Sequence, residues 1–475
     1  MLITERFWES NEVGEAELLL SKMAGKCLFD KNERQWYEWC GNRWSKTDSG
    51  VVEPLFKEVV ADIKRQGELL ITAAEPTTFK LLKKELHKRV KALNSYYRRK
   101  ALIGLAESMS RSVVIPWDNS QMKLPCANGV IDLETGKLIP PSPKQFYRII
   151  SPIHYRTSAM TCPMWEKFVL VVMDGDQELA SFLQRLIGYV VSGTQQEHIF
   201  PIFYGRGRNG KSLFIETMKK VLGDMASPVS PSLLLESSYQ RDAAAPSPHI
   251  LKLRGLKLAW SEETDEGRKL STGTVKLICG GGTLSGRGLH ERYETTFQST
   301  HTLFLLTNHK PVAAPDDYAL WERVLLIPFL LSFVEHPVKK FERERSLTLP
   351  KWFETEAPGI LSWIVKGCLE WQRHGLQVPS SIKAQVLSYI KEIDIVGMFV
   401  SEYLEITNRE SDRIPAKDLY EGFKYWCRRT GNPVYNITKF GKHLTTKISK
   451  QRKGTGIQYL GVRRRGVSFN PADMS

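Results

Sequence analysis

The chain has 475 residues, 42% hydrophobic and 25% charged, which excludes a disordered or membrane-embedded protein and favours roughly two to four folded domains. Its net charge of +15 favours a polyanionic partner, nucleic acid before membrane, although a basic surface without a partner is the alternative. No apolar run approaches the roughly 20 residues of a membrane span, no signal peptide is evident, and the seven cysteines form no zinc-binding cluster, so we expect a cytoplasmic protein without membrane contact.

The first part of the chain is predicted to be helical after a short β-like patch. Residues 35–44 alternate aromatic side chains around Gly41 and Asn42, which is the pattern of a hairpin. Helical spacing follows over 51–63 and again over 79–105. The second stretch carries a strongly basic set: Lys80, Lys83, Lys84, Lys88, Arg89, Lys91, Arg98, Arg99 and Lys100. Such a run is most often a solvated helix face, and DNA contact is the alternative.

The middle of the chain alternates between strand and helix signals. Residues 128–136 read as a strand and a turn, and residues 164–191 as helices. From about 196 to 335 the alternation is typical of an α/β nucleotide-binding domain. After Pro337 the pattern becomes helical, and Pro379 is a reasonable hinge before a small C-terminal domain.

A phosphate-binding loop is the clearest motif. The segment from Gly205 to Ser212 fits GxxxxGK[ST], between an apolar strand at 199–204 and a helix at 213–222. Backbone N–H groups then surround phosphates at a helix N-terminus, Lys211 reaches the β- and γ-phosphates, and Ser212 contacts Mg²⁺. The predicted nucleotide-binding residues are Gly205, Arg206, Gly207, Arg208, Asn209, Gly210, Lys211, Ser212 and Leu213. We therefore predict that the chain binds a nucleoside triphosphate.

An acid pair follows the next apolar strand, which starts at Leu256 and ends in Glu262 and Glu263. Hydrolysis needs one carboxylate near Mg²⁺ and another that orients the attacking water. We assign Glu262 to the metal and Glu263 to the base, with the order left open. Without the phosphate-binding loop, such a pair would more often be solvated surface.

Two further residues lie beside buried strands. Asn308 ends the strand 301–307, where it can sense the γ-phosphate or position water, and a turn-forming asparagine is the alternative. Arg323 immediately precedes the strand 324–329, where it can reach the triphosphate of an adjacent subunit as an arginine finger. A plain surface arginine is the alternative there.

Two basic segments are candidate DNA contacts. Residues 276–293 predict a glycine-rich hairpin whose basic residues Arg287, His290 and Arg292 can grip a phosphate backbone, or else an ordinary loop. Near the C-terminus, helices at 414–427 and 439–447 precede a basic turn at 450–456 and a strand at 457–464. This order resembles a winged helix, in which DNA contact and protein contact are both open. The residues predicted to meet phosphate in that turn are Lys450, Arg452 and Lys453.

In this order, the phosphate-binding loop, the acid pair, the Lys-x-x-x-Gly-Gly hairpin, the asparagine strand and Trp-x-Arg-x-x-x-Ile-Pro-Phe resemble the superfamily 3 helicases. The most similar group is the helicase region of phage and plasmid primase–helicases, which is related to poxvirus primase–helicases. Residues 11–16, 36–44 and 128–136 resemble that family's helicase-associated N-terminal domain. Residues 356–361 resemble its helical segment after the motor, and residues 414–462 its C-terminal winged helix.

The resemblance implies an α/β fold: an AAA+-type P-loop ATPase core with a mainly helical α+β N-terminal domain and a C-terminal winged helix. The implied domains are 1–190 (N-terminal, with the basic helices), 191–335 (ATPase core), 336–390 (helical segment) and 391–475 (winged helix). It also implies a ring, usually a hexamer, that uses ATP and Mg²⁺ to move 3′ to 5′ on single-stranded and forked DNA. The residues that take the implied nucleotide roles are Lys211, Ser212, Glu262, Glu263, Asn308 and, acting in trans, Arg323.

The chain departs from the family pattern at several points. Glu322 stands where many relatives have an arginine, Thr283 stands where the hairpin often has an acid, and residues 262–267 admit a second alignment. Met1 begins almost where the associated domain begins, so we expect no primase active site in this polypeptide and a possible primase or initiator partner.

We therefore expect an ATP-dependent DNA helicase that acts in the replication of a phage, plasmid or other mobile element, in the cytoplasm of a bacterial host. The alternative is an ATP-switched DNA-binding initiator or assembly protein without processive unwinding. A small-metabolite kinase would explain neither the basic charge nor the C-terminal segment.

Overall fold

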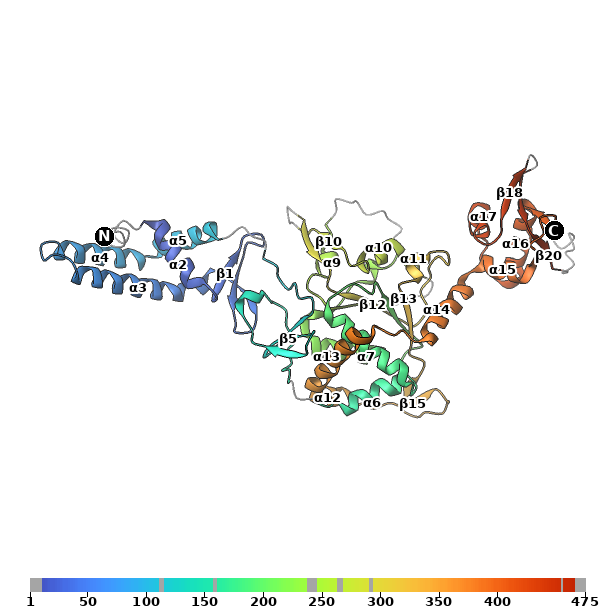
Figure 1. Ribbon diagram of the computed structural model, residues 1–475, viewed down its shortest axis with the longest axis horizontal. Coiled ribbons are helices and arrows are strands. Elements are labelled where there is room, and N and C mark those ends of the chain that lie inside the picture. Colours follow the sequence, from blue (N-terminus) through green and yellow to red (C-terminus); the bar gives the residue numbers. More distant parts are fainter. Residues whose placement is uncertain are drawn as a thin grey trace.

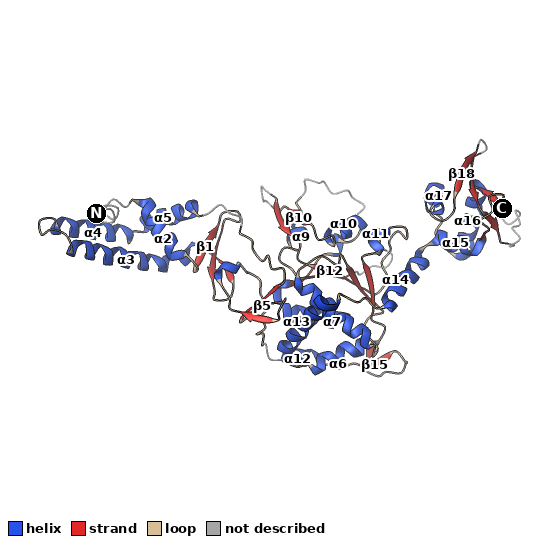
Figure 2. Ribbon diagram, in the orientation of Figure 1, coloured by secondary structure: helices blue, strands red, loops and turns tan. Residues whose placement is uncertain are grey.

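The computed structural model describes residues 11–110, 115–156, 160–236, 246–262, 268–289, 294–453 and 456–465. Figure 1 shows an elongated molecule with three parts in a row: a helical N-terminal part, a central α/β part and a small C-terminal part. Figure 2 shows that helices dominate the first part, while strands are concentrated in the other two and at the first junction. In the part of the chain described, no helix combines the length and apolar character that crossing a bilayer requires.

The N-terminal part is a helical bundle with a small sheet at its inner end (Figure 1). Its helices are α2 (Glu12–Met23), α3 (Glu53–Thr72), α4 (Phe79–Leu93) and α5 (Tyr96–Met109). Its antiparallel sheet has the order β1 (Cys27–Asp30), β2 (Gln35–Trp39), β3 (Trp44–Thr47). The expected hairpin around Gly41 is confirmed by the pairing of β2 with β3. The helical stretch expected over 79–105 is broken, because Ser95 adopts an extended backbone between α4 and α5.

A second antiparallel sheet connects this bundle to the centre. It consists of β4 (Lys123–Cys126), β5 (Gly129–Asp132) and β6 (Lys137–Ile139). The strand expected within 128–136 is therefore the middle strand of this sheet. Its buried residues Leu124 and Ile131 belong to the same hydrophobic cluster as the central part.

The central part is built on a five-stranded parallel sheet with the order β13-β7-β12-β9-β8. Its strands are β7 (Phe200–Tyr204), β8 (Ala226–Pro228), β9 (Leu258–Glu262), β12 (Thr302–Thr307) and β13 (Val324–Pro328). Strands β12 and β13 are buried at every residue, as expected for a parallel sheet covered on both faces. The carboxyl ends of β7, β9 and β12 therefore meet at one edge.

Helices that come before, between and after the strands in the sequence cover the lower face of this sheet in Figure 1. They are α6 (Pro163–Val172), α7 (Gln177–Ser192), α8 (Lys211–Leu222), α12 (Leu349–Thr355) and α13 (Ala357–His374). Trp165 joins them, since its ring lies 5.1 Å from Phe214, 5.3 Å from Phe353 and 5.7 Å from Trp363. This core crosses the domain boundaries expected at residues 190 and 335.

The contact between α7 and α13 is close enough to require glycine. A Cβ atom on Gly188 would lie 2.1 Å from the backbone of Gly367 and Cys368. We predict that Gly188→Ala costs about 1–3 kcal/mol of stability through overpacking, and lowers Tm by roughly 2–5 °C in a thermal melt. Gly104→Ala is the matched control, because that helical glycine has no atom within 4 Å of the added Cβ. An equal Tm for the Gly188 variant and the wild type would contradict the packing.

The opposite face carries short helices and a hairpin. These elements are α9 (Pro248–Leu251), α10 (Thr272–Ile278), β10 (Thr283–Gly286), β11 (Thr295–Gln298) and α11 (Tyr318–Trp321). After β13 the chain forms a parallel pair, β14 (Ser332–Val334) with β15 (Glu342–Glu344), before the helices expected after Pro337 begin.

Helix α14 (Ser380–Ile393) leads to the C-terminal part. Its Val386 and Tyr389 are buried in a cluster of the central part, so the chain leaves that part after α14 rather than at Pro379. The C-terminal helices are α15 (Ile395–Tyr403), α16 (Ala416–Thr430) and α17 (Ile437–Thr445). Its strands are β16 (Leu404–Ile406), β17 (Arg413–Pro415), β18 (Lys450–Lys453), β19 (Gly456–Leu460) and β20 (Val462–Arg464). The strand expected over 457–464 is divided at Gly461, whose φ of +69° turns β20 onto a different sheet from β19.

Candidate nucleotide site and nucleic-acid contacts

The loop between β7 and α8 has the backbone of a phosphate cradle. Gly205 has a φ of +147°, and a Cβ there would lie 2.1 Å from the Phe329 carbonyl oxygen. Gly210 has a φ of +90° and N-caps α8. Both positions therefore require glycine. The buried Asn209 donates from Nδ2 to the Phe329 carbonyl at 3.0 Å, which holds the loop against the end of β13.

Lys211 begins α8 and points back into this loop. Its Nζ donates to the Gly205 carbonyl at 2.6 Å and to Asn308 Oδ1 at 3.3 Å, and the residue is only 6% exposed. Burial lowers the pKa of Lys211 to about 8, against the opposing influence of the Glu262 carboxylate. The ammonium group is thus held among oxygen acceptors at the N-terminus of a helix, where an anion is favoured.

The predicted residues of three separate segments meet at this edge. Glu262 is the exposed last residue of β9 and lies opposite Leu306 of β12, two residues before Asn308. Ser212 is exposed in the first turn of α8, while Leu213 is half-buried. Arg206, Gly207 and Arg208 form the exposed crest of the loop.

The donor set at this edge suits a hard cation. The Ser212 hydroxyl and the Glu262 carboxylate offer oxygen atoms, which Mg²⁺ prefers, and Mg²⁺ commonly takes only one or two protein ligands beside phosphates and water. The second acid, Glu263, lies outside the described residues. No group of three or more His, Cys, Asp or Glu side chains with metal-binding geometry occurs within the described ranges.

Arg323 lies at the other end of the strands, next to the amino end of β13. It precedes β13, and the five residues of that strand span about 16 Å between it and the edge where Lys211 lies. Its Nη1 donates to the Ala319 carbonyl of α11. Its Nε is buried without a hydrogen-bond partner among the described residues. This guanidinium therefore cannot reach the phosphate-binding loop of its own subunit.

The segment after Asn308 connects the site with three other elements. Lys310 pairs with Glu392 of α14 at 2.9 Å and lies 4.7 Å from the Tyr389 ring centroid. Asp317 pairs with Lys276 of α10 at 3.1 Å. Asp316 lies 3.5 Å from Nδ1 of His443 in α17. No local sequence pattern indicates these contacts, because each joins residues that are at least 41 positions apart.

The hairpin predicted after α10 exists as the antiparallel pair β10–β11. Arg287 follows β10, and its backbone N–H and carbonyl both bond to Ser247, beside α9. His290 and Arg292 lie outside the described residues. Lys276 stands on α10, below the hairpin rather than on it.

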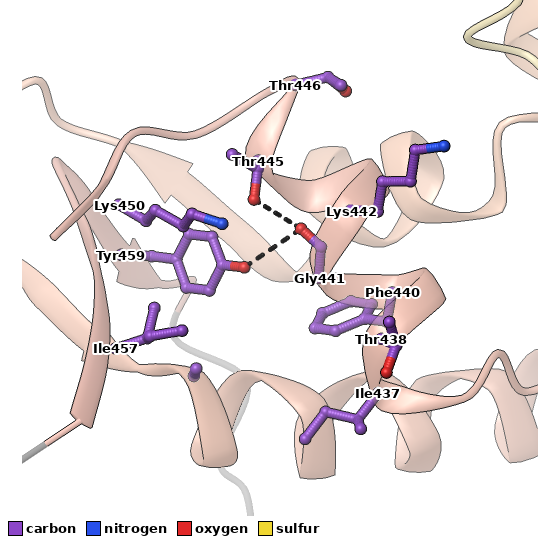
Figure 3. A pocket seen from close by; sticks show the side chains of 11 residues that line it. Ile437, Thr438, Phe440, Gly441, Lys442, Thr445, Thr446, Lys450, Ile457 and Tyr459 are labelled. Atoms are coloured by element: carbon purple, nitrogen blue, oxygen red, sulfur yellow. Dashed lines mark hydrogen bonds between the residues drawn. The ribbon is translucent and has the colours of Figure 1, made fainter. Parts of the chain in front are cut away.

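The C-terminal part presents a groove between α17 and the hairpin β18–β19, with a volume of about 550 Å³. Figure 3 shows Lys450 and Tyr459 on the side of the hairpin and Phe440 and Lys442 on the side of α17. The Tyr459 hydroxyl donates to the Gly441 carbonyl at 3.4 Å, which joins the hairpin to the helix. Arg452 is exposed on β18, and the side chain of Lys453 lies outside the described residues.

Known protein families match the chain near both of its ends. Residues 16–174 match the family model described as D5 N terminal like, and residues 391–473 match Poxvirus D5 protein-like. A protein named as a helicase in Acanthamoeba polyphaga mimivirus is 25% identical over 441 residues, covering 87% of this chain and 45% of its own. A protein named as a primase in African swine fever virus is 27% identical over 273 residues, covering 54% and 27%. A protein named as a helicase in Sputnik virophage is 22% identical over 270 residues, covering 55% and 34%.

Among solved structures, the apo form of the NrS-1 C-terminal region is similar, with a TM-score of 0.52 and 12% identity. The match covers 96% of this chain and 100% of the other, and at this identity it shows the fold alone. The chain spans less than half the length of the curated relatives it matches. The relatives named above are viral, and the bacterial compartment expected from the sequence stays a prediction. The chain therefore carries D5-type regions near both ends and is similar to viral proteins named as helicases and primases, which agrees with the resemblance to D5-like primase–helicases expected from its motifs.

Proposed function

We propose that this chain is an ATP-driven DNA helicase motor that works as a ring and moves 3′ to 5′ on the strand it encircles. The observation that carries the proposal is the meeting of Lys211, Glu262 and Asn308, from three segments, at one edge of the sheet. Phosphoryl transfer is catalysed mainly by positioning and charge, and these are the groups that supply both.

In this proposal each residue at the edge has one task. Lys211 leaves its carbonyl acceptors and binds the β- and γ-phosphates, while the Gly205–Gly210 backbone surrounds them. Glu263 orients the attacking water, and Asn308, which contacts Lys211 Nζ at 3.3 Å, registers the γ-phosphate. Ser212 and Glu262 would hold Mg²⁺, which supplies charge neutralisation at the phosphates when it is bound.

The sheet order supports an AAA+-type assignment of the central part. Strand β12, with the sensing residue at its tip, lies between the loop strand β7 and the acid strand β9. Arg323 at the far edge would then act on the nucleotide of the neighbouring subunit. We further propose that residues 391–475 form a winged helix, with α17 and the hairpin β18–β19 as its nucleic-acid contacts.

The contacts of residues 310–317 offer a route from nucleotide to DNA. The same segment that follows Asn308 holds Lys276 at the base of the β10–β11 hairpin and His443 of α17. If Asn308 moved when the γ-phosphate is lost, both proposed DNA contacts would therefore move with it. Arg287, His290 and Arg292 are proposed to grip the strand at the hairpin.

Strand displacement on tailed duplexes tests the proposal. With ATP and Mg²⁺, the protein should separate a duplex that carries a 3′ single-stranded tail and leave one with only a 5′ tail intact. Polarity is read from which labelled strand is released, with a non-hydrolysable ATP analogue as the control. Displacement from the 5′ tail alone would overturn the direction.

One observation also favours an ATP-switched initiator, because the Asp316–His443 contact ties the nucleotide segment to a C-terminal DNA-binding candidate. In that case ATP hydrolysis would be stimulated by DNA, and neither tailed duplex would be separated. The same assay therefore distinguishes the two functions.

A further inference from the structure

The basic helices of the N-terminal part contain two sets of cations with different surroundings. Residues 79–109 carry nine lysines and arginines against two glutamates. The three arginines face inward: Arg89 and Arg98 both bind the buried Glu15, at 3.1 and 2.7 Å. Arg99 pairs with Glu53 at 3.0 Å and lies 5.4 Å from the Phe56 ring centroid. These arginines join α4 and α5 to α2 and α3 and are not available to a ligand.

The six lysines of the same stretch are exposed and form no ion pair with the described residues. Their positions are Lys80, Lys83, Lys84, Lys88, Lys91 and Lys100. At 3.6 residues per turn, Lys80, Lys84, Lys88 and Lys91 fall within about 80° of one another on α4 and span about 16 Å along it. The buried Leu86 and Leu93 lie on the other side of the helix. The structure thus places a one-sided cationic stripe on an already folded bundle.

Two exposed aromatic side chains follow this stripe in the sequence. Tyr96 and Tyr97 open α5, directly after the turn at the end of α4, and they are 68% and 82% exposed. Their ring centroids are 5.6 Å apart, and the Lys100 ammonium lies 6.0 Å from the Tyr96 ring centroid. Each ring therefore exposes a large apolar face to water, beside a cluster of cations.

We propose that this lysine–tyrosine surface, made of Lys80, Lys84, Lys88, Lys91, Tyr96 and Tyr97, binds single-stranded nucleic acid. The lysines would follow the phosphates while exposed bases stack on the tyrosine rings, the combination that sequence-tolerant single-strand sites use. A duplex would offer the phosphates but not the base faces. An acidic peptide or an anionic bilayer would use the lysines alone.

The surface lies in the N-terminal part, at the far end of the molecule from the C-terminal groove (Figure 1). It rests on the proposed function only in taking the ligand to be the strand that the ring handles. It would give that strand a contact outside the ring, separate from the hairpin and from α17.

Salt titration of binding to a fluorescent oligo-dT by the full chain, without nucleotide, tests the surface. Lys84→Ala/Lys88→Ala/Lys91→Ala should reduce the slope of log affinity against log salt by roughly 2, because each lost phosphate contact removes about 0.7. Tyr96→Ala/Tyr97→Ala should weaken binding by roughly 5- to 150-fold per stacked base at an unchanged slope. Phenylalanine at both positions should restore the affinity.

The matched control is Lys46→Ala/Lys57→Ala/Lys137→Ala, which removes the same charge from exposed lysines outside α4 and α5. Equal losses in this control and in the α4 variant would overturn the proposal, since charge alone would explain both. A wild-type affinity for oligo-dT in the tyrosine variant would also overturn it. So would tighter binding of the wild-type protein to anionic vesicles than to DNA. ATP hydrolysis without DNA should be normal in all variants, whereas its absence from the wild type would contradict only the motor function.

Discussion

Replacing Lys211 by alanine is expected to reduce ATP hydrolysis at least ~100-fold while the fold stays intact. The ammonium group is the one cation that the described structure places inside the Gly205–Gly210 loop, and no neighbouring side chain can take its position. Alanine is well suited to the first turn of α8, and removing the buried charge relieves its desolvation, which offsets the lost hydrogen bonds to Gly205 and Asn308. Steady-state phosphate release at saturating ATP measures the effect, with Tm as the check on folding.

Lys220→Ala is the matched control, since Lys220 stands on the same helix in an exposed pair with Glu354. Its hydrolysis should equal that of the wild type. A second readout uses the lowered pKa of Lys211, about 8. The ammonium form is lost as pH rises through that value, so wild-type affinity for ATP should fall by up to ~tenfold per unit above it. The Lys211 variant should lack this dependence, and robust hydrolysis by it would refute the assigned site.

Local sequence patterns predict most of the strands of the central part. Strands buried on both faces appear as continuous apolar runs, and the runs ending at Tyr204, Glu262 and Thr307 are strands β7, β9 and β12. Parallel strands align their carboxyl ends, so the residues that follow β7 and β12 lie at the same end of the sheet, where Lys211 Nζ and Asn308 Oδ1 are 3.3 Å apart. The roles of these residues stay predictions.

Tertiary packing decides what the patterns do not contain. The sequence presents the cations of 79–100 as one basic run, whereas the structure divides them into inward arginines and outward lysines. That division depends on Glu15, which lies more than seventy residues away. Position 188 likewise requires glycine because it packs against Gly367, which lies on a helix that is far away in the sequence. Residues 310–317 likewise meet their partners on α10, α14 and α17 only in the folded chain, because those partners are far away in the sequence.

Arg323→Ala should leave ATP binding intact and slow hydrolysis by roughly 10³- to 10⁵-fold in the assembled protein, the range for loss of an arginine finger. The reason is geometric: Arg323 lies at the amino end of β13, away from its own Lys211, so in the proposed ring its guanidinium would serve a nucleotide only across a subunit interface. ATP binding is measured with a fluorescent analogue and hydrolysis by phosphate release. Glu322→Ala, an exposed neighbour, is the control and should remain active.

Mixing two inactive variants separates an action in trans from a structural defect. In a 1:1 mixture of Lys211→Ala and Arg323→Ala subunits, an interface is productive when the Arg323 variant supplies the loop and its neighbour supplies the arginine. Random assembly of head-to-tail interfaces would restore about a quarter of wild-type hydrolysis. If Arg323 served its own subunit, or only stabilised β13 through Ala319, no interface would combine an intact loop with an intact arginine. The mixture would then stay as inactive as either variant alone, and the proposed ring catalysis would fail with it.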